Sequence, residues 1–80
     1  MTKILILSPP RYEKLAREFR LELAKYFGFK NVKIRFHNGE NFTVYVNHRI
    51  FIDRRYVKSL KQLNYLFWSA WKMKRMWNIY

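Results

Sequence analysis

The chain has 80 residues, of which 50% are hydrophobic and 20% aromatic. This composition excludes a disordered tail, and the length predicts a single domain spanning residues 1–80 with one modest core. Seventeen Lys and Arg against five Asp and Glu give a formal net charge of +12, while the absence of cysteine excludes disulfides and cysteine-ligated zinc. So positive a balance predicts a polyanionic partner, with nucleic acid favoured over an anionic membrane surface.

The N-terminal third predicts a buried strand followed by a helix. Residues 3–7 read Lys-Ile-Leu-Ile-Leu, and the short, continuous apolar run that follows Lys3 is typical of a buried central strand. Ser8 can cap a following helix, and Pro9 suits a first helical turn. We expect this helix to run from about Pro9 to Phe27, with Gly28 in the left-handed conformation that ends many helices. Its core-facing positions recur at helical spacing: Tyr12, Leu15, Ala16, Phe19, Leu23, Tyr26 and Phe27.

The middle of the chain predicts two or three short strands. Residues 32–36 and residues 42–46 each alternate apolar and polar side chains, and Asn38-Gly39 between them is a strong signal for a tight hairpin turn. A second break at residues 47–49 leads into residues 50–52, which are a third candidate strand. The apolar side of these strands should face the helices. The other side presents Lys33, Arg35, His37, Thr43, Tyr45 and Asn47.

The stretch from Arg54 to Tyr80 predicts one long helix, because it contains no Gly and no Pro and follows Asp53, a good N-cap residue. At about 100° per residue the stretch divides into two faces. The apolar face holds Tyr56, Leu60, Leu63, Phe67, Ala70 and Trp71. The opposite face holds Arg54, Lys58, Lys61, Tyr65, Trp68, Lys72 and Met76. No acidic residue occurs in the stretch.

The predicted elements follow the order β-α-β-β-(β)-α. The natural arrangement is a small two-layer α+β fold, in which both helices pack on one face of a sheet of three or four strands. The long C-terminal helix should extend beyond the domain, because burial is expected to end near Trp71.

Cations interleaved with aromatic rings on the solvent side of the C-terminal helix predict a nucleic-acid-binding surface. Lys and Arg neutralise phosphates, and flat rings stack on bases. DNA is slightly favoured over RNA because a basic helix fits the major groove. The helix face has few amide side chains for reading base edges, with only Gln62 nearby, which predicts low specificity. The expected contacts are Arg54, Arg55, Lys58, Lys61, Tyr65, Trp68, Lys72, Lys74 and Arg75. A secondary candidate is the outer sheet face, with Lys33, Arg35 and Tyr45.

Other classes of function stay open. A non-enzymatic interaction or oligomeric structural protein would use the projecting C-terminal end, with self-association into a homodimer favoured. The contacts of that end are Met73, Met76, Trp77, Ile79 and Tyr80. A small ribonuclease or toxin-like enzyme would use His37 and His48, although no catalytic spacing is present and no metal or cofactor is expected.

Attachment to a membrane surface through the Trp- and Lys-rich C-terminus is the least favoured use of the chain. Residues 4–7 are too short an apolar run for a signal peptide, so we expect an intracellular, cytoplasmic protein, in a host cell if the source is viral.

The order helix, strand, hairpin, helix from Arg11 to Met76 resembles the core of the minimal zinc metalloproteases. In that family the second helix carries the HExxH motif after an apolar run. The segment here reads LNYLFWSAWKMKR, and Ser69-Ala70-Trp71-Lys72-Met73 occupies the register of the motif. The zinc ligands and the catalytic Glu are absent, so the resemblance implies a scaffold without that chemistry.

Overall fold

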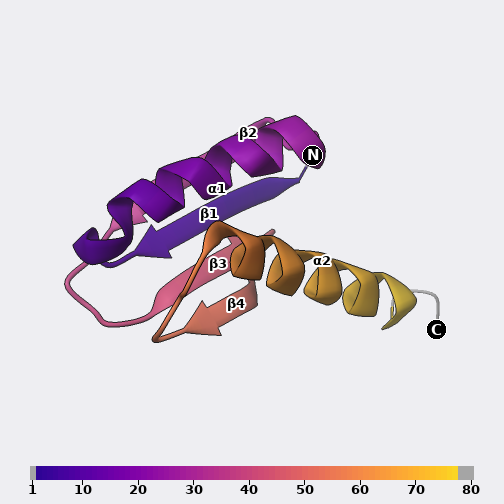
Figure 1. The fold of residues 1–80 in the computed structure, drawn as a ribbon. Helices are drawn as coiled ribbons and strands as arrows, with labels where there is room; N and C mark the ends of the chain where they lie inside the picture. Colours follow the sequence, from indigo (N-terminus) through magenta and orange to yellow (C-terminus); the bar gives the residue numbers. More distant parts are fainter. Residues whose placement is uncertain (1, 78–80) are drawn as a thin grey trace.

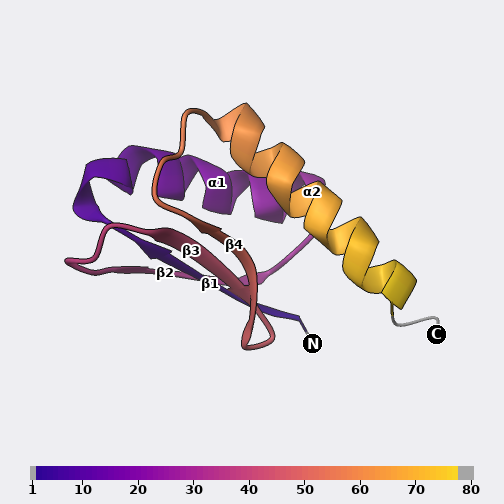
Figure 2. The ribbon, with the colours of Figure 1, turned by 90° about the horizontal axis from the view of Figure 1, so that it is seen from below.

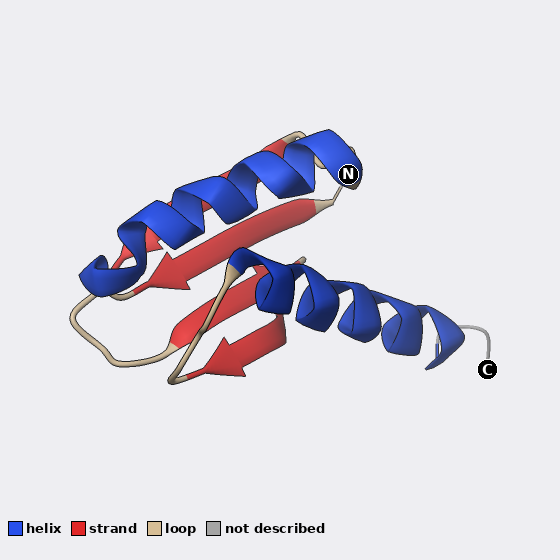
Figure 3. Ribbon diagram, in the orientation of Figure 1, coloured by secondary structure: helices blue, strands red, loops and turns tan. Residues whose placement is uncertain are grey.

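The computed structural model describes residues 2–77, with side chains described as far as Met73. Two helices cover one face of a four-stranded sheet in the order β-α-β-β-β-α (Figures 1 and 3), which confirms the predicted α+β fold. The elements are β1 (Lys3–Ser8), a 3-10 helix (Pro10–Tyr12), α1 (Glu13–Tyr26), β2 (Asn31–Phe36), β3 (Phe42–Val46), β4 (Arg49–Arg54) and α2 (Leu60–Trp77).

The central position in the sheet belongs to β1. The strand order is β2-β1-β3-β4, with β1 parallel to β2 and antiparallel to β3, and with β3 antiparallel to β4. The parallel pair requires a crossover connection, which α1 supplies. Both edges of β1 are therefore paired, as its continuous apolar sequence predicted.

The tight hairpin predicted at Asn38-Gly39 is wrong, because β1 lies between β2 and β3 and pairs with both. Residues 37–41 instead cross the end of β1, where the amide of His37 donates to the carbonyl of Ser8 at 3.1 Å. Gly39 permits a close approach in this loop. A Cβ added to Gly39 would lie 2.6 Å from Nδ1 of His37, and the Gly39 amide donates to that nitrogen at 2.9 Å.

The two-residue hairpin turn lies between β3 and β4. Asn47 and His48 have φ values of 50° and 69°, the left-handed conformation that a type I′ turn requires at both central positions. Asn and His tolerate this region better than most residues with a side chain. The turn also holds the start of β1, because the Asn47 amide donates to the carbonyl of Lys3 at 2.8 Å and Asn47 Oδ1 accepts from the Lys3 amide at 2.9 Å.

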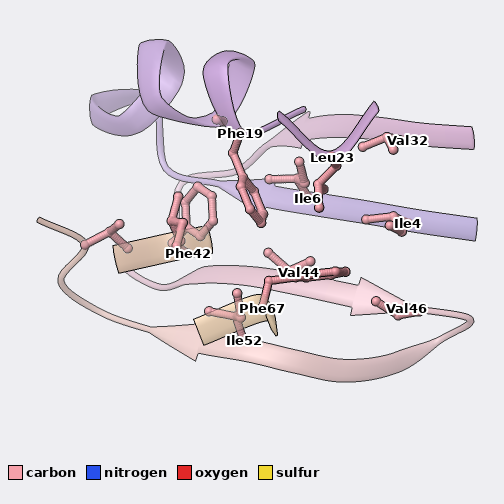
Figure 4. Close-up of a cluster of buried hydrophobic side chains, with 13 residues drawn as sticks. Ile4, Ile6, Phe19, Leu23, Val32, Phe42, Val44, Val46, Ile52 and Phe67 are labelled. Atoms are coloured by element: carbon pink, nitrogen blue, oxygen red, sulfur yellow. The ribbon is translucent and has the colours of Figure 1, made fainter. Parts of the chain in front are cut away.

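The core lies between the two helices and the inner face of the sheet (Figures 2 and 4). Phe67 of α2 is fully buried at its centre, and its ring lies 5.2–6.1 Å from five other aromatic rings. Those rings belong to Phe19, Phe27, Phe29, Phe51 and Trp71. A few large aromatic side chains thus fill the interior of a small domain.

The start of α1 differs from the prediction. Ser8 is buried at the end of β1, and its hydroxyl donates to the carbonyl of Pro9, so Ser8 does not cap a helix. A 3-10 turn follows before α1 begins at Glu13. Gly28 has a φ of 74° just after α1, which confirms its predicted conformation. Tyr26, predicted to face the core, is instead 68% exposed.

The helix predicted from Arg54 begins only at Leu60. Asp53 and Arg54 are the last residues of β4. The carboxylate of Asp53 accepts hydrogen bonds from the side chains of Asn41 and Thr43, so Asp53 is not an N-cap.

Ser59 takes the capping role at the start of α2. Its Oγ accepts a hydrogen bond from the amide of Gln62 at 3.2 Å, while Gln62 Oε1 accepts one from the amide of Lys58 at 2.7 Å. In the connection before α2, Tyr56 is 68% exposed and Val57 is buried. The prediction that Tyr56 faces the core is therefore wrong, because the segment that holds it is not helical.

The inner side of α2 agrees with the prediction. Leu63 and Phe67 are fully buried and Trp71 is half-buried. The last turns of α2 extend past the end of the sheet (Figure 2), and Met73 there is 58% exposed. The other contacts predicted for this end lie outside the described side chains: Met76, Trp77, Ile79 and Tyr80.

Candidate nucleic-acid interface

The predicted basic surface of α2 contains four described side chains, here termed the α2 stripe: Lys61, Tyr65, Trp68 and Lys72. Their spacing of four, three and four residues places them on one side of the helix, and all four are exposed. The ring of Trp68 lies 5.9 Å from the ring of Phe27 and 5.6 Å from the Lys72 ammonium group. Trp68 is thus fixed against the core while about half of it, 48%, remains accessible.

Three predicted cations lie before α2 and do not extend the stripe. Arg54 ends β4, and Lys58 is exposed in the connection that follows. The guanidinium group of Arg55 forms an ion pair with the carboxylate of Glu40 at 2.9 Å, so part of its charge is already compensated. The side chains of the last two predicted cations lie outside the description: Lys74 and Arg75.

Most acidic side chains lie in the layer formed by α1 and α2, here termed the helix layer. Three of the five acids in the sequence lie on α1: Glu13, Glu18 and Glu22. Glu18 and Glu22 line a hollow that also includes Leu60, the first residue of α2. Lys25 lines the same hollow, so a phosphate approaching the first turn of α2 meets carboxylates and cations together, which makes this layer less favourable to a polyanion than a surface of cations alone.

The sheet face opposite the helices, here termed the open face, is not covered by any described element (Figure 2). The strand register places its side chains in rows that run from β2 to β4. One row is Lys33, Leu5, Tyr45 and Ile50. The next row is Arg35, Leu7, Thr43 and Asp53. The open face thus has a cationic edge on β2, an aliphatic strip on β1 and an aromatic ring on β3.

A hollow of about 520 Å³ opens on this face. Its lining combines three cations with polar and aliphatic groups and includes no acidic residue: Lys3, Ile4, Leu5, Leu7, Asn31, Lys33, Arg35, Tyr45 and His48. Neither ion pair found among the described residues involves Lys3, Lys33 or Arg35. The acid of the neighbouring row, Asp53, is engaged by the Thr43 hydroxyl at 3.2 Å. The three cations are therefore available to an anionic ligand.

The two histidines lie at opposite ends of β1 and do not form a pair. The amide of His37 bonds the last residue of β1, whereas His48 lies in the turn that bonds the first. The His37 ring is held within its own loop, where Nδ1 accepts from Gly39 and Nε2 lies 3.0 Å from the carbonyl of Asn41. Within residues whose side chains are described, no group of three or more His, Cys, Asp or Glu could hold a metal ion.

Arg11 and Tyr12 organise the segments that lead to α2, a role that helical periodicity does not predict. Arg11 Nη2 donates to the carbonyls of Glu40 at 2.9 Å and Arg55 at 3.1 Å. The Tyr12 hydroxyl oxygen accepts a hydrogen bond from the Val57 amide at 3.2 Å. This bond, helped by the Arg11 guanidinium group, lowers the pKa of Tyr12.

Sequence reasoning named Lys33, Arg35 and Tyr45 on the open face but missed Lys3 and His48, which line the same hollow. Only the strand order brings these residues together, because β1 inserts between β2 and β3. The apolar run on β1 was the sequence signal that could have placed this strand at the centre of the sheet. In a central strand of a two-layer fold, alternate residues of such a run must point away from the helices.

Neither protein-family models nor curated proteins match this chain. None of the described helices is long and apolar enough to cross a membrane. The chemistry of the open face and of the α2 stripe is therefore the basis for assigning a function.

Proposed function

We propose that this protein binds nucleic acid through its phosphates, with the open face as the main site. The supporting observation is the hollow that gathers the cations of Lys3, Lys33 and Arg35 without an acid in its lining. A net charge of +12 adds long-range attraction for a polyanion. Because phosphates are common to every sequence, we expect low sequence specificity.

The α2 stripe is the second surface for the same function. Lys61 and Lys72 flank two accessible rings there, and an α-helix fits the major groove of duplex DNA. The neighbouring carboxylates of Glu18 and Glu22 and the ion pair of Arg55 make this surface less favourable to phosphates than the open face. We therefore rank it below the open face.

We propose that the protein binds nucleic acid without acting on it as an enzyme. The rings of the two histidines cannot act on one substrate bond, since His37 and His48 lie at opposite ends of β1. The ring of His37 is also engaged by its own loop through both nitrogens.

Fluorescence anisotropy of labelled oligonucleotides across a salt series tests the proposal. Neutralising three phosphates of a single strand predicts that log K falls with log salt at a slope of about 2, at roughly 0.7 per contact. Absence of binding to single strands and to duplexes even at low salt would refute nucleic-acid binding.

Charge reversals locate the surface. The double variant Lys33→Glu with Arg35→Glu should lower the salt slope by about 1.4, because two phosphate contacts are lost. Lys14→Glu with Arg20→Glu is the matched control, since both residues are exposed on α1 and the net charge changes equally. Equal losses in both double variants would show that only total charge matters.

Self-association through the helix layer is a second candidate function. The observation that favours it is a set of exposed hydrophobic side chains on α1 and α2: Leu21, Tyr26, Tyr65, Trp68 and Met73. Sedimentation equilibrium should then show a dimer that Tyr65→Glu with Met73→Glu weakens at least about tenfold. A monomer at every concentration would exclude this function.

A further inference from the structure

The four strands of the open face are together wider than the major groove of duplex DNA. Neighbouring strands lie about 4.8 Å apart, so the outer strands of four are separated by about 14 Å before side chains are added. The major groove of B-DNA is about 12 Å wide and admits a helix or a two-stranded ribbon. An unpaired strand has no groove that the sheet must enter, so it can lie across the sheet and contact β2 and β3 together.

The rows of the open face suit the parts of such a strand. Lys33 on β2 and Tyr45 on β3 flank Leu5 on β1 in one row, so a cation and a ring stand on either side of an aliphatic surface. A phosphate can pair with the cation while a base lies against the ring. Arg35 repeats the cation in the next row, on the same strand as Lys33.

Two neutral polar side chains in the lining of the hollow can form hydrogen bonds with a ribose. Asn31 and His48 line the hollow together with the cations, and none of the side-chain hydrogen bonds found among the described residues uses either of them. An amide and an imidazole can each donate and accept hydrogen bonds. Such side chains can bond the ribose 2′-hydroxyl, which both donates and accepts and which RNA has and DNA lacks.

We propose that the open face binds single-stranded RNA, with one base against Tyr45, phosphates at Lys33 and Arg35, and ribose at Asn31 and His48. This assignment rests on the nucleic-acid binding proposed above and specifies its ligand. The α2 stripe takes no part in it, because it lies in the helix layer on the opposite side of the sheet (Figure 2).

Anisotropy with a short labelled oligouridine, the matching deoxy strand and an RNA duplex tests this assignment. Wild-type protein should bind the RNA strand most tightly. Tyr45→Ala should weaken that binding about 5- to 150-fold, the usual effect of removing one stacked ring, and leave the duplex unchanged. Tyr45→Phe should retain binding because it keeps the ring. Tyr56→Ala, which removes an exposed ring outside both the open face and the α2 stripe, should also bind normally.

Crosslinking gives a readout that does not depend on the stability of a variant. Irradiation of wild-type protein with 5-iodouridine RNA should label the tryptic peptide of residues 36–49, which contains Tyr45. Labelling of residues 62–72, which hold Tyr65 and Trp68, would overturn the assignment.

Other results would separate this assignment from the broader proposal. Equal or tighter binding of the duplex or of the deoxy strand would overturn single-stranded RNA as the ligand while nucleic-acid binding stands. A loss of affinity with Tyr65→Ala equal to that with Tyr45→Ala would move the site to α2. If no oligonucleotide binds at low salt, the broader proposal fails with it.

Discussion

The two faces of the sheet differ in what they bury and in what they leave free. Along β1, Ile4 and Ile6 point to the inner face and are buried, while Leu5 and Leu7 point to the open face and are only partly buried. The inner face is packed with aromatic rings from α1 and α2, and the open face presents unpaired cations beside a hollow. One strand thus contributes to the core on one side and to the proposed ligand surface on the other.

The largest effect should come from the inner face. Phe67→Ala removes the ring that lies among five others and should lower the free energy of unfolding by about 3–5 kcal/mol. Tyr65→Ala, two residues away but 69% exposed, should change it by no more than about 0.5 kcal/mol. Urea unfolding of both variants measures the difference. Similar losses would mean that the two sides of α2 are not distinct.

Adjacent residues on β1 give a direct comparison of the two faces. Ile6→Ala should cost about 2–5 kcal/mol, since Ile6 is fully buried in the core. Leu5→Ala should cost about 1 kcal/mol, because a partly buried side chain loses only part of its transfer free energy. Thermal unfolding of the pair checks the order. A larger cost at Leu5 would contradict the division of the strand into a core side and a ligand side.

Removing the N-cap of α2 should have a smaller effect on the free energy of unfolding. Ser59→Ala removes the oxygen that accepts the Gln62 amide and should cost about 1 kcal/mol. Ser59→Asp should restore the stability, because Asp is an equally good N-cap. Denaturant titration of the two variants distinguishes a capping role from a role in packing, in which the Asp variant would remain as unstable as the Ala variant.

The smallest effect on stability should come from the cations of the open face. Lys33→Glu with Arg35→Glu should change the free energy of unfolding by no more than about 0.5 kcal/mol, since both side chains are exposed and neither belongs to an ion pair of the described residues. The same variant is expected to lose binding. A marked fall in its melting temperature would show that the two faces are energetically coupled.

Periodicity predicted most of the helical residues that face the core, although Tyr26 and Tyr56 are exposed. The spacing of Phe19 and Leu23 on α1 and of Leu63 and Phe67 on α2 identified buried residues, because helical geometry alone places them on one side. The start of α2 was less predictable. Asp53 and Ser59 are both good N-cap residues, and the choice between them depends on the pairing of β4 with β3.

The open face could be predicted only in part, because periodicity does not say which strands are neighbours. Asn38-Gly39 has the composition of a hairpin turn, yet the turn formed at Asn47-His48. The insertion of β1 between β2 and β3 depends on contacts between distant parts of the chain. Without that strand order, Lys33 and Tyr45 appear as neighbours on a hairpin instead of as the two sides of a hollow.

The position of β2 and β4 at the two edges of the sheet has a consequence for solubility. A free edge can pair with an edge of another copy and start aggregation, and natural proteins oppose this with charged side chains and irregular pairing. Lys33 and Arg35 place charge along β2, and a register shift at Val44/Tyr45 makes the pairing of β4 irregular. Exchanging both β2 cations for valine would therefore favour growth of the sheet from one molecule to the next.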